Sequence, residues 1–321
     1  MLDLYKHHRR ECIAFIVLFA LLSLYIATHP RGASTYVMTI WANQCLILAL
    51  AAMAQFFVVL VRGIDLSVGA IMALSNCVAS YVLVGSGIDL FYGSIAVVLT
   101  GTLCGALNGL IVVYGRIQPI IVTLATGSVF IGIALLLRPT PGGTINYDFA
   151  DAMTLDIAGI PTAVIICAVL LIGFWIPLRR SGLGRAFYAI GSSEQAAFQS
   201  GISVNTVRIF AFAMGGTFAG LAGSYFSYVT ATGDAGIAAN FTLNSIAAVV
   251  LGGVALSGGV GSLVGALLGA CILKTISSLM FFSGLPPLAQ PLIEGVVLAG
   301  AIAIGSSEVL RMKNRLQVFD R

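Results

Sequence analysis

Few side chains in this 321-residue sequence combine the types and spacing that acid–base, metal or nucleotide chemistry requires. The six cysteines are far apart and leave no CxxC or zinc-ligand spacing, and the three histidines form no i,i+4 pair. Neither a G-x-x-x-x-G-K-S/T phosphate loop nor a Ser/His/Asp or HExxH arrangement occurs. We therefore predict no enzyme activity, no metal site and no cofactor.

One polar segment interrupts an otherwise apolar chain, the sequence AIGSSEQAAFQSGI at residues 189–202. It carries a single acid, Glu194, and its small residues have the pattern of a helix. Three arginines, Arg179, Arg180 and Arg185, come just before it. The segment is predicted to be a short solvated helix, and these residues alone leave open whether a partner or only water covers it.

The composition is that of an integral membrane protein. Hydrophobic residues make up 59% of the chain and charged residues 9%, whereas a soluble domain has roughly 25% charged residues. The apolar runs are long enough for helices rather than the ~10-residue strands of a membrane barrel. We predict one all-α domain over residues 1–321, a polytopic membrane helical bundle of about ten transmembrane helices. The runs cover 12–28, 40–61, 66–84, 91–114, 119–137, 160–178, 205–229, 243–257, 261–282 and 288–305.

The distribution of basic residues gives this bundle an orientation. If the N-terminus is cytoplasmic, nearly all Lys and Arg fall in cytoplasmic segments, as the positive-inside rule requires. Only Arg31 and Arg138 fall outside, and Lys274 lies within a span. Both termini are therefore predicted to be cytoplasmic. The net charge of +4 is divided among short loops, so no nucleic-acid partner is expected. The outer loop at 138–160, rich in Pro, Gly and Asp, is predicted to be ordered.

Ionisable side chains inside the spans are rare. Glu294 is the only acid well inside a run, and Lys274 lies at a similar depth on the other side of a turn near Gly284. Because lone charges in a bilayer are costly, we predict a structural Lys274–Glu294 ion pair, with a role in transport as the alternative. A proton-coupled transporter usually needs a relay of buried ionisable side chains. A single glutamate gives little support to such a mechanism, although it does not exclude one.

The turn after the second apolar run contains two candidate helix-capping residues. Asp65 and Ser67 are predicted to cap the helix that follows this turn.

Segments 58–69 and 248–259 share residues at equivalent positions, such as Ser67 with Ser257, which indicates either an internal duplication or a chance match. Helix-spaced glycines predict two closely packed helix faces, formed by Gly101, Gly105 and Gly109 and by Gly261, Gly265 and Gly269.

Four segments together resemble a known family. They are GIDLSVGA (63–70), GALNGLIVVYGRIQPIIVTLATG (105–127), GLGRAFYAIGSSEQAAFQSGI (182–202) and IAAVVLGGVALSGGVGSLVGALLGA (246–270). In this order and spacing they are similar to permease subunits of bacterial ABC sugar importers of the ribose/xylose/arabinose/galactose type. The resemblance implies a type II importer of the inner membrane. In it two permease subunits, identical or different, work with two cytoplasmic ATPase subunits and a periplasmic solute-binding protein.

The resemblance also implies a role for the polar segment, which forms a coupling helix on the ATPase in this family. The matching positions are Gly191, Ser193, Glu194, Ala196, Ala197 and Gly201. Ala196 and Ala197 would allow close approach, Gly201 would end the helix, and Glu194 would offer an acceptor to a basic groove. Ser193 and Gln199 depart from the Asn and basic residue common in the family, which leaves the partner ATPase unidentified.

Polar side chains within the spans are candidates for the translocation path, and interhelical hydrogen bonding is their alternative role. They are Asn43, Asn76, Asn108, Thr123, Thr126 and Asn244, with Gln44, Tyr225 and Tyr228 as further candidates. No charged residue accompanies them, which favours a small neutral solute, most simply a monosaccharide. Nucleosides, branched-chain amino acids and furanosyl signals remain alternatives within the fold. An alternative from a different class of transport protein is a secondary transporter driven by an ion gradient.

Overall fold

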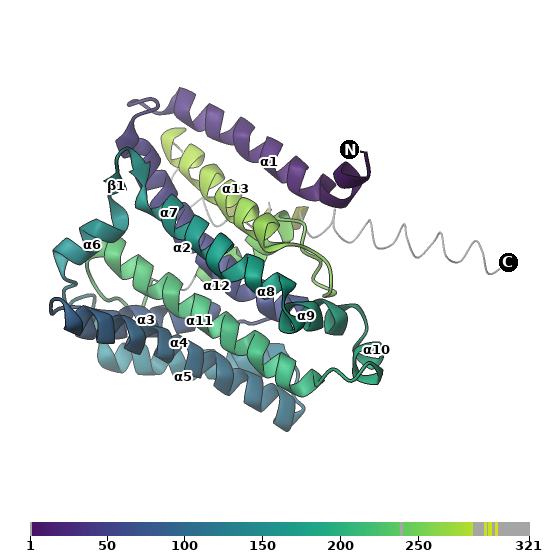
Figure 1. Cartoon of the computed structure of the whole chain (residues 1–321). Coiled ribbons are helices and arrows are strands. Elements are labelled where there is room, and N and C mark those ends of the chain that lie inside the picture. Colours follow the sequence, from purple (N-terminus) through teal and green to yellow (C-terminus); the bar gives the residue numbers. More distant parts are fainter. Residues whose placement is uncertain (1, 238–239, 285–291, 294, 297–298, 301–321) are drawn as a thin grey trace.

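The computed structural model describes residues 2–237 and 240–284, together with 292–293, 295–296 and 299–300. Its regular structure is almost entirely helical (Figure 1). The elements are α1 (Leu2–Thr28), α2 (Thr35–Leu60), α3 (Val68–Val82), α4 (Ile88–Gly115), α5 (Pro119–Leu137), α6 (Tyr147–Thr154), β1 (Asp156–Ile157), β2 (Ile160–Pro161), α7 (Thr162–Val169), the π-helix η1 (Leu170–Trp175), α8 (Ile176–Arg180), α9 (Gly182–Ser192), α10 (Glu194–Gln199), α11 (Val204–Thr230), α12 (Phe241–Leu251) and α13 (Leu263–Phe282).

Long apolar helices dominate the described residues. Seven helical segments there are long and apolar enough to cross a membrane, and α7, η1 and α8 together form one of them. The predicted runs at 66–84 and 243–257 correspond to the shorter apolar helices α3 and α12. The run at 288–305 lies largely outside the described residues. The all-α, polytopic character of the chain is thus confirmed.

The helices pack around a central pair. Figure 1 shows α1 and α13 on one side of the bundle and α3, α4 and α5 on the other, with α2 and α11 between them. Most of α2 is enclosed by other helices. Of an apolar stretch of 18 residues in α2, 94% is buried, whereas only 11% of the corresponding stretch of α1 is buried. Because α2 is apolar on all sides, it suits a position surrounded by other helices.

The glycine face of α4 brings this helix close to α11. A Cβ atom at Gly105 would meet the Phe212 carbonyl and the Gly216 backbone, so the absence of a side chain permits the contact. The first predicted glycine face is therefore confirmed. In the second, Gly269 of α13 contacts the Ala248 backbone of α12 and Gly265 contacts the Gly252 backbone just after α12. Gly261 instead lies in the turn before α13, with φ of 128°. That part of the prediction is wrong because the helix begins later than the apolar run.

The predicted Lys274–Glu294 pair remains a prediction, because Glu294 lies outside the described residues. Lys274 lies in α13, and its Nζ is 5.4 Å from the centroid of the Phe241 ring in α12. This distance is within the range of a cation–π interaction.

The loop at 138–160, predicted to be ordered, contains α6 and a short β1–β2 hairpin. The Asn146 side chain caps α6 by accepting a hydrogen bond from the Phe149 N–H at 2.9 Å. The hairpin pairs Asp156 with Pro161 and Ile157 with Ile160. The prediction of an ordered feature in this loop is confirmed.

Candidate functional site

The polar segment at 189–202 folds as the end of α9, a break at Ser193, and α10. Ser193 is extended, with φ of −157°, and its hydroxyl accepts a hydrogen bond from the Ala196 N–H at 3.3 Å. This cap for α10 competes with continuation of α9, so one predicted helix becomes two. Gly201, with φ of 82°, ends α10 in the left-handed conformation, as predicted.

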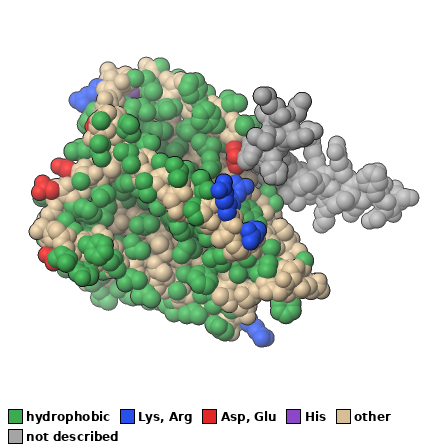
Figure 2. Space-filling model, viewed as in Figure 1, with side chains coloured by type: hydrophobic (Ala, Val, Ile, Leu, Met, Phe, Trp, Pro, Cys, Tyr) green, Lys and Arg blue, Asp and Glu red, His purple; other side chains and the backbone are tan. Residues whose placement is uncertain are grey.

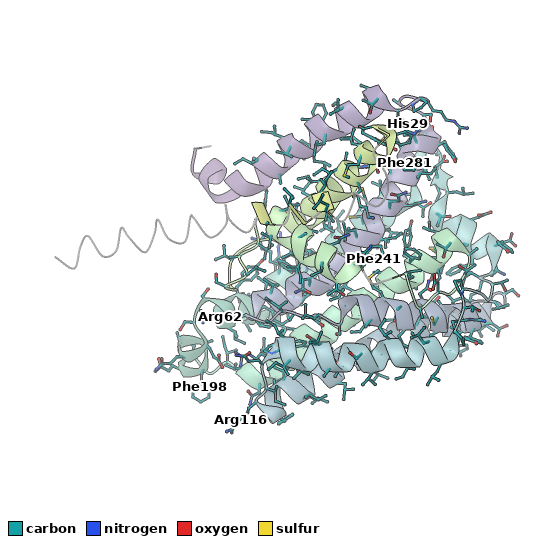
Figure 3. All side chains as sticks on the ribbon, turned by 180° about the vertical axis from the view of Figure 1, so that it is seen from behind. His29, Arg62, Arg116, Phe198, Phe241 and Phe281 are labelled. Carbon is teal, nitrogen blue, oxygen red and sulfur yellow. The ribbon has the colours of Figure 1, made fainter. Side chains whose placement is uncertain are left out.

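The side chains of α10 point in different directions. Ala197 is only 3% exposed and packs into the core, whereas Ala196 lies on the exposed side. Only one of the two alanines is therefore available for close approach by a partner. Phe198 is 71% exposed and projects away from the bundle in Figure 3. The sequence reasoning missed this ring, because phenylalanine gives no distinct signal in so apolar a chain.

Glu194 already has a partner within the chain. Its Oε2 accepts a hydrogen bond from Arg208 Nη2 of α11 at 2.6 Å, and both side chains are partly exposed. Ion pairs exposed to this degree contribute roughly 0–1 kcal/mol to the stability of the fold. The carboxylate can therefore exchange Arg208 for a basic group on another protein at little cost.

Buried contacts fix α9 to the bundle. Phe187 is fully buried, and its ring centroid lies 5.9 Å from that of Phe57 in α2. Ile190 is also fully buried. The Tyr188 hydroxyl donates a hydrogen bond to the Gly261 carbonyl at 2.9 Å, and burial raises the pKa of Tyr188, which keeps this donor protonated. Any movement of α10 therefore reaches a helix embedded in the core.

Gly191 forms the closest of these contacts. A Cβ atom at this position would meet both the Leu60 carbonyl oxygen at the end of α2 and the Gly259 backbone nitrogen. The Gly259 N–H also donates to the Leu60 carbonyl at 3.1 Å. The ends of α2 and α9 and the turn before α13 thus meet backbone to backbone, and only glycine leaves room for this.

Arg62 holds the same junction from the α2–α3 turn. Its Nε donates to the Gly191 carbonyl at 2.8 Å, and its Nη2 donates to the Ser192 carbonyl at 2.7 Å. Figure 3 shows Arg62 at the end of the molecule that carries Phe198, far from His29. The sequence indicated Arg62 only as one basic residue of a cytoplasmic turn.

The turns after α2 and α12 have the same hydrogen-bond pattern. The Gly63 N–H donates to the Val58 carbonyl, and the Val254 N–H donates to the Val249 carbonyl. The residues just before these donors are left-handed, Arg62 with φ of 64° and Gly253 with φ of 79°. Both helices therefore end in a Schellman motif, and the structural equivalence is shifted by one residue from the sequence match.

Comparison with known proteins identifies the family. Residues 37–302 match the family described as "Branched-chain amino acid transport system / permease component". The chain belongs to this permease family. It is 33% identical to the ribose import permease protein of Haemophilus influenzae, over 92% of this chain and 91% of that protein. No solved structure matches the chain.

Two further relatives extend the comparison. The D-allose transport system permease protein of Escherichia coli K12 is 31% identical, over 81% of this permease and 80% of the relative. The autoinducer 2 import system permease protein of an Enterobacter species is 34% identical, over 92% of this chain and 86% of the relative. The chain is thus the membrane-spanning permease component of an ABC importer in the inner membrane. It works with a separate ATPase and a solute-binding protein.

Asp65 of the permease lies in a buried polar cluster at the start of α3. Its Oδ1 accepts hydrogen bonds from the Ser67 N–H at 2.7 Å and the Ser67 hydroxyl at 2.6 Å, and that hydroxyl also accepts from the Asn108 amide at 2.8 Å. The Ser67 side chain does not cap α3, so that part of the capping prediction is wrong. The reason is that the hydroxyl is bonded to Asp65 and Asn108 instead.

Replacing Asp65 by asparagine is expected to leave stability and uptake near the wild-type level. Burial raises the pKa of the Asp65 carboxyl, with hydrogen bonds from Ser67 opposing this effect. Asp65 Oδ2 and Asn108 Oδ1 are buried acceptors without a hydrogen-bond partner in the described part of the chain. The new amide would keep the acceptor that Ser67 uses and replace the partnerless Oδ2 by a donor.

The matched variant Asp65→Ala removes the acceptor and is expected to cost about 1–3 kcal/mol, because it leaves buried Ser67 groups unpaired. Thermal unfolding in detergent and vesicle uptake measure both effects. Equal damage in the two variants would show that the permease requires a charged carboxylate.

Two predicted path residues bind α6 and the loop at 231–236 of the permease. The Asn43 amide donates to the Thr154 carbonyl at the end of α6 at 2.8 Å, and its oxygen accepts from the Tyr225 hydroxyl at 2.9 Å. The Asn76 oxygen accepts from the Asp234 N–H at 2.7 Å. In the conformation described, these amides fasten α6 and the 231–236 loop to the bundle.

The remaining path candidates differ in their burial. Asn108 and Thr123 are buried, and the Thr123 hydroxyl accepts from the Leu66 N–H at 2.9 Å, so both support the α2–α3 turn. Thr126 and Asn244 are partly exposed, and Thr126 bonds to the Val122 carbonyl of its own helix at 3.0 Å. The six candidates therefore do not form one cluster in this conformation.

Proposed function

We propose that this permease imports a small neutral solute of the monosaccharide type, driven by ATP hydrolysed on the partner subunits. The observation that supports this most strongly is the similarity to ribose and allose permeases over most of the chain. The similarity to an autoinducer 2 permease makes a furanosyl signal the second candidate. The family description also names branched-chain amino acids. Nucleosides are a further alternative within the fold.

We further propose a single domain of ten spans with both termini in the cytoplasm. In Figure 2 the acidic side chains of the visible face gather mostly at the end that carries α6 and β1. The largest group of basic side chains on this face lies near α8 and α9, toward the other end, with others at the lower edge and at the upper left. The positive-inside rule then directs α9 and α10 toward the cytoplasm and α6 toward the periplasm.

The cytoplasmic segment 189–202 is the proposed contact with the ATPase. Exposed groups of this segment would touch the partner, namely Ser193, Glu194, Ala196 and Phe198. Gly191, Ala197 and Gly201 would shape the segment, since Gly191 and Ala197 are buried and Gly201 ends α10. An exposed aromatic ring beside small residues is a common form of binding hot spot.

The complete importer would contain two permease subunits, either two copies of this chain or this chain and a second permease. The solute-binding protein would dock on the outer loops at 138–160 and 230–242. Solute would pass along the predicted path residues after the helices move. Thr126 and Asn244 are the proposed direct contacts, because they are the partly exposed members of that set.

Crosslinking and uptake test this proposal together. A cysteine placed at exposed Gln195 of α10 is expected to crosslink to the ATPase, whereas one placed at exposed Asp156 of β1 is not. In vesicles, ribose uptake is expected to require ATP, the ATPase and the binding protein. Crosslinking from position 156 instead of 195, or uptake by the permease alone under a proton gradient, would contradict the proposal.

A further inference from the structure

The backbone at Arg62 has a conformation that favours glycine. Its φ of 64° is left-handed, and the equivalent position after α12 is occupied by Gly253 with φ of 79°. A residue with a Cβ atom is strained in this conformation, whereas glycine is not. The turn therefore does not require arginine for its own geometry, and the reason for arginine at this position lies in the contacts of its side chain.

Those contacts join two segments far apart in the sequence. The guanidinium group spans the Gly191 and Ser192 carbonyls, the last two of α9, which have no acceptor role within their own helix. A cation is favourable at a helix C-terminus, and the planar fork of arginine matches two neighbouring acceptors. On its other side, the Arg62 stem lies against Gly258 of the turn before α13.

The turn that follows Arg62 leads directly into the bundle. The Leu66 N–H donates to the Thr123 hydroxyl of α5, and Ser67 is bonded to Asn108 of α4. These bonds connect the turn to α4 and α5, while the chain itself continues into α3. A displacement of α9 can therefore reach three further helices through the Arg62 side chain and the few residues after it.

We propose that Arg62 is a positioning residue that couples movement of α9 and α10 to the α2–α3 turn. The inference rests on the proposed docking of segment 189–202 on the ATPase. The role of Arg62 is positional because its Nε and Nη2 are bonded to the Gly191 and Ser192 carbonyls. It transmits displacement because two charge-assisted hydrogen bonds hold the end of α9 to a turn that is in turn bonded to α4 and α5.

The variant Arg62→Gly tests this role, because glycine suits the backbone conformation and removes only the side chain. We expect an unfolding temperature no lower than that of the wild type and unchanged crosslinking from position 195 to the ATPase. Ribose uptake should fall by about tenfold, within the usual range of coupling between sites, and more ATP should be hydrolysed per sugar imported. Arg62→Lys, with one compact donor group, should retain intermediate coupling.

The chain offers a matched control at Arg116, which is exposed, ends α4 and has φ of 53°. Arg116→Gly relieves the same backbone strain and should leave uptake unchanged. Full coupling in Arg62→Gly would overturn the inference while leaving the docking proposal intact. Loss of the crosslink in Arg62→Gly would also overturn it, since Arg62 would then only shape the docking surface. Absence of the crosslink in the wild type would reject the docking proposal, and this inference with it.

Discussion

Replacing Phe198 by alanine is expected to lower ATP-driven solute uptake by about thirtyfold without destabilising the permease. The ring is 71% exposed, so its removal leaves no cavity in the bundle. If α10 docks on the ATPase, the ring enters an apolar pocket there, and truncation of such an anchor costs about 2 kcal/mol or more. Vesicle uptake and the affinity between permease and ATPase in detergent would both measure the loss.

Tyr114→Ala provides the control for this experiment. Tyr114 is 73% exposed and lies in the last turn of α4, so the two aromatic rings have nearly equal exposure. Because Tyr114 lies outside segment 189–202, its truncation should leave uptake and affinity near the wild-type values. Equal losses in both variants would point to a general effect of exposed rings, and no loss at Phe198 would argue against docking through α10.

Gly191→Ala is expected to destabilise the permease by about 3 kcal/mol and to abolish coupled uptake. The new methyl group would meet the Leu60 carbonyl and the Gly259 nitrogen, which are both backbone atoms. No side-chain rotation can relieve such a contact, so the end of α9 must separate from α2. The unfolding temperature in detergent would report the loss of stability, and vesicle uptake would report the loss of coupling.

Gly182→Ala makes the same chemical change at the other end of α9. No atom lies within 4 Å of the Cβ position there, and the backbone conformation accepts an L residue. We expect a change of stability within about 0.5 kcal/mol and normal uptake. If Gly191→Ala behaved like Gly182→Ala, the tight junction between α2, α9 and the turn before α13 would not be essential.

The helical bundle could be predicted from the sequence because the length of the apolar runs follows directly from the thickness of the bilayer. Glycine spacing likewise predicted the contact of Gly105 with α11, since close helix approach requires small residues at regular intervals. The shorter helices α3 and α12 were harder to predict. The predicted runs at 66–84 and 243–257 extend past an end of each helix, because apolar residues such as Leu66 and Val254 continue into the flanking turns.

The candidate site could be predicted only in part. The polar segment and Gly201 were recognisable because both differ from their surroundings in composition or conformational preference. The contacts of Arg62 with Gly191 and Ser192 were not, because they join residues that only the tertiary fold brings together. The burial of Ala197 also depends on how α10 is turned against the bundle, which the short stretch between two caps does not determine.

The aromatic packing of Phe187 limits how α9 can respond to a load. This ring lies against Phe57 of α2, which in turn contacts Trp175 of η1 and stacks on Phe218 of α11. Rings interlocked from four elements resist sliding, because each would have to leave its neighbours. If α10 docks on the ATPase as proposed, a displacement of α10 would therefore be expected to tilt α2, α11 and η1 together, at the centre of the bundle.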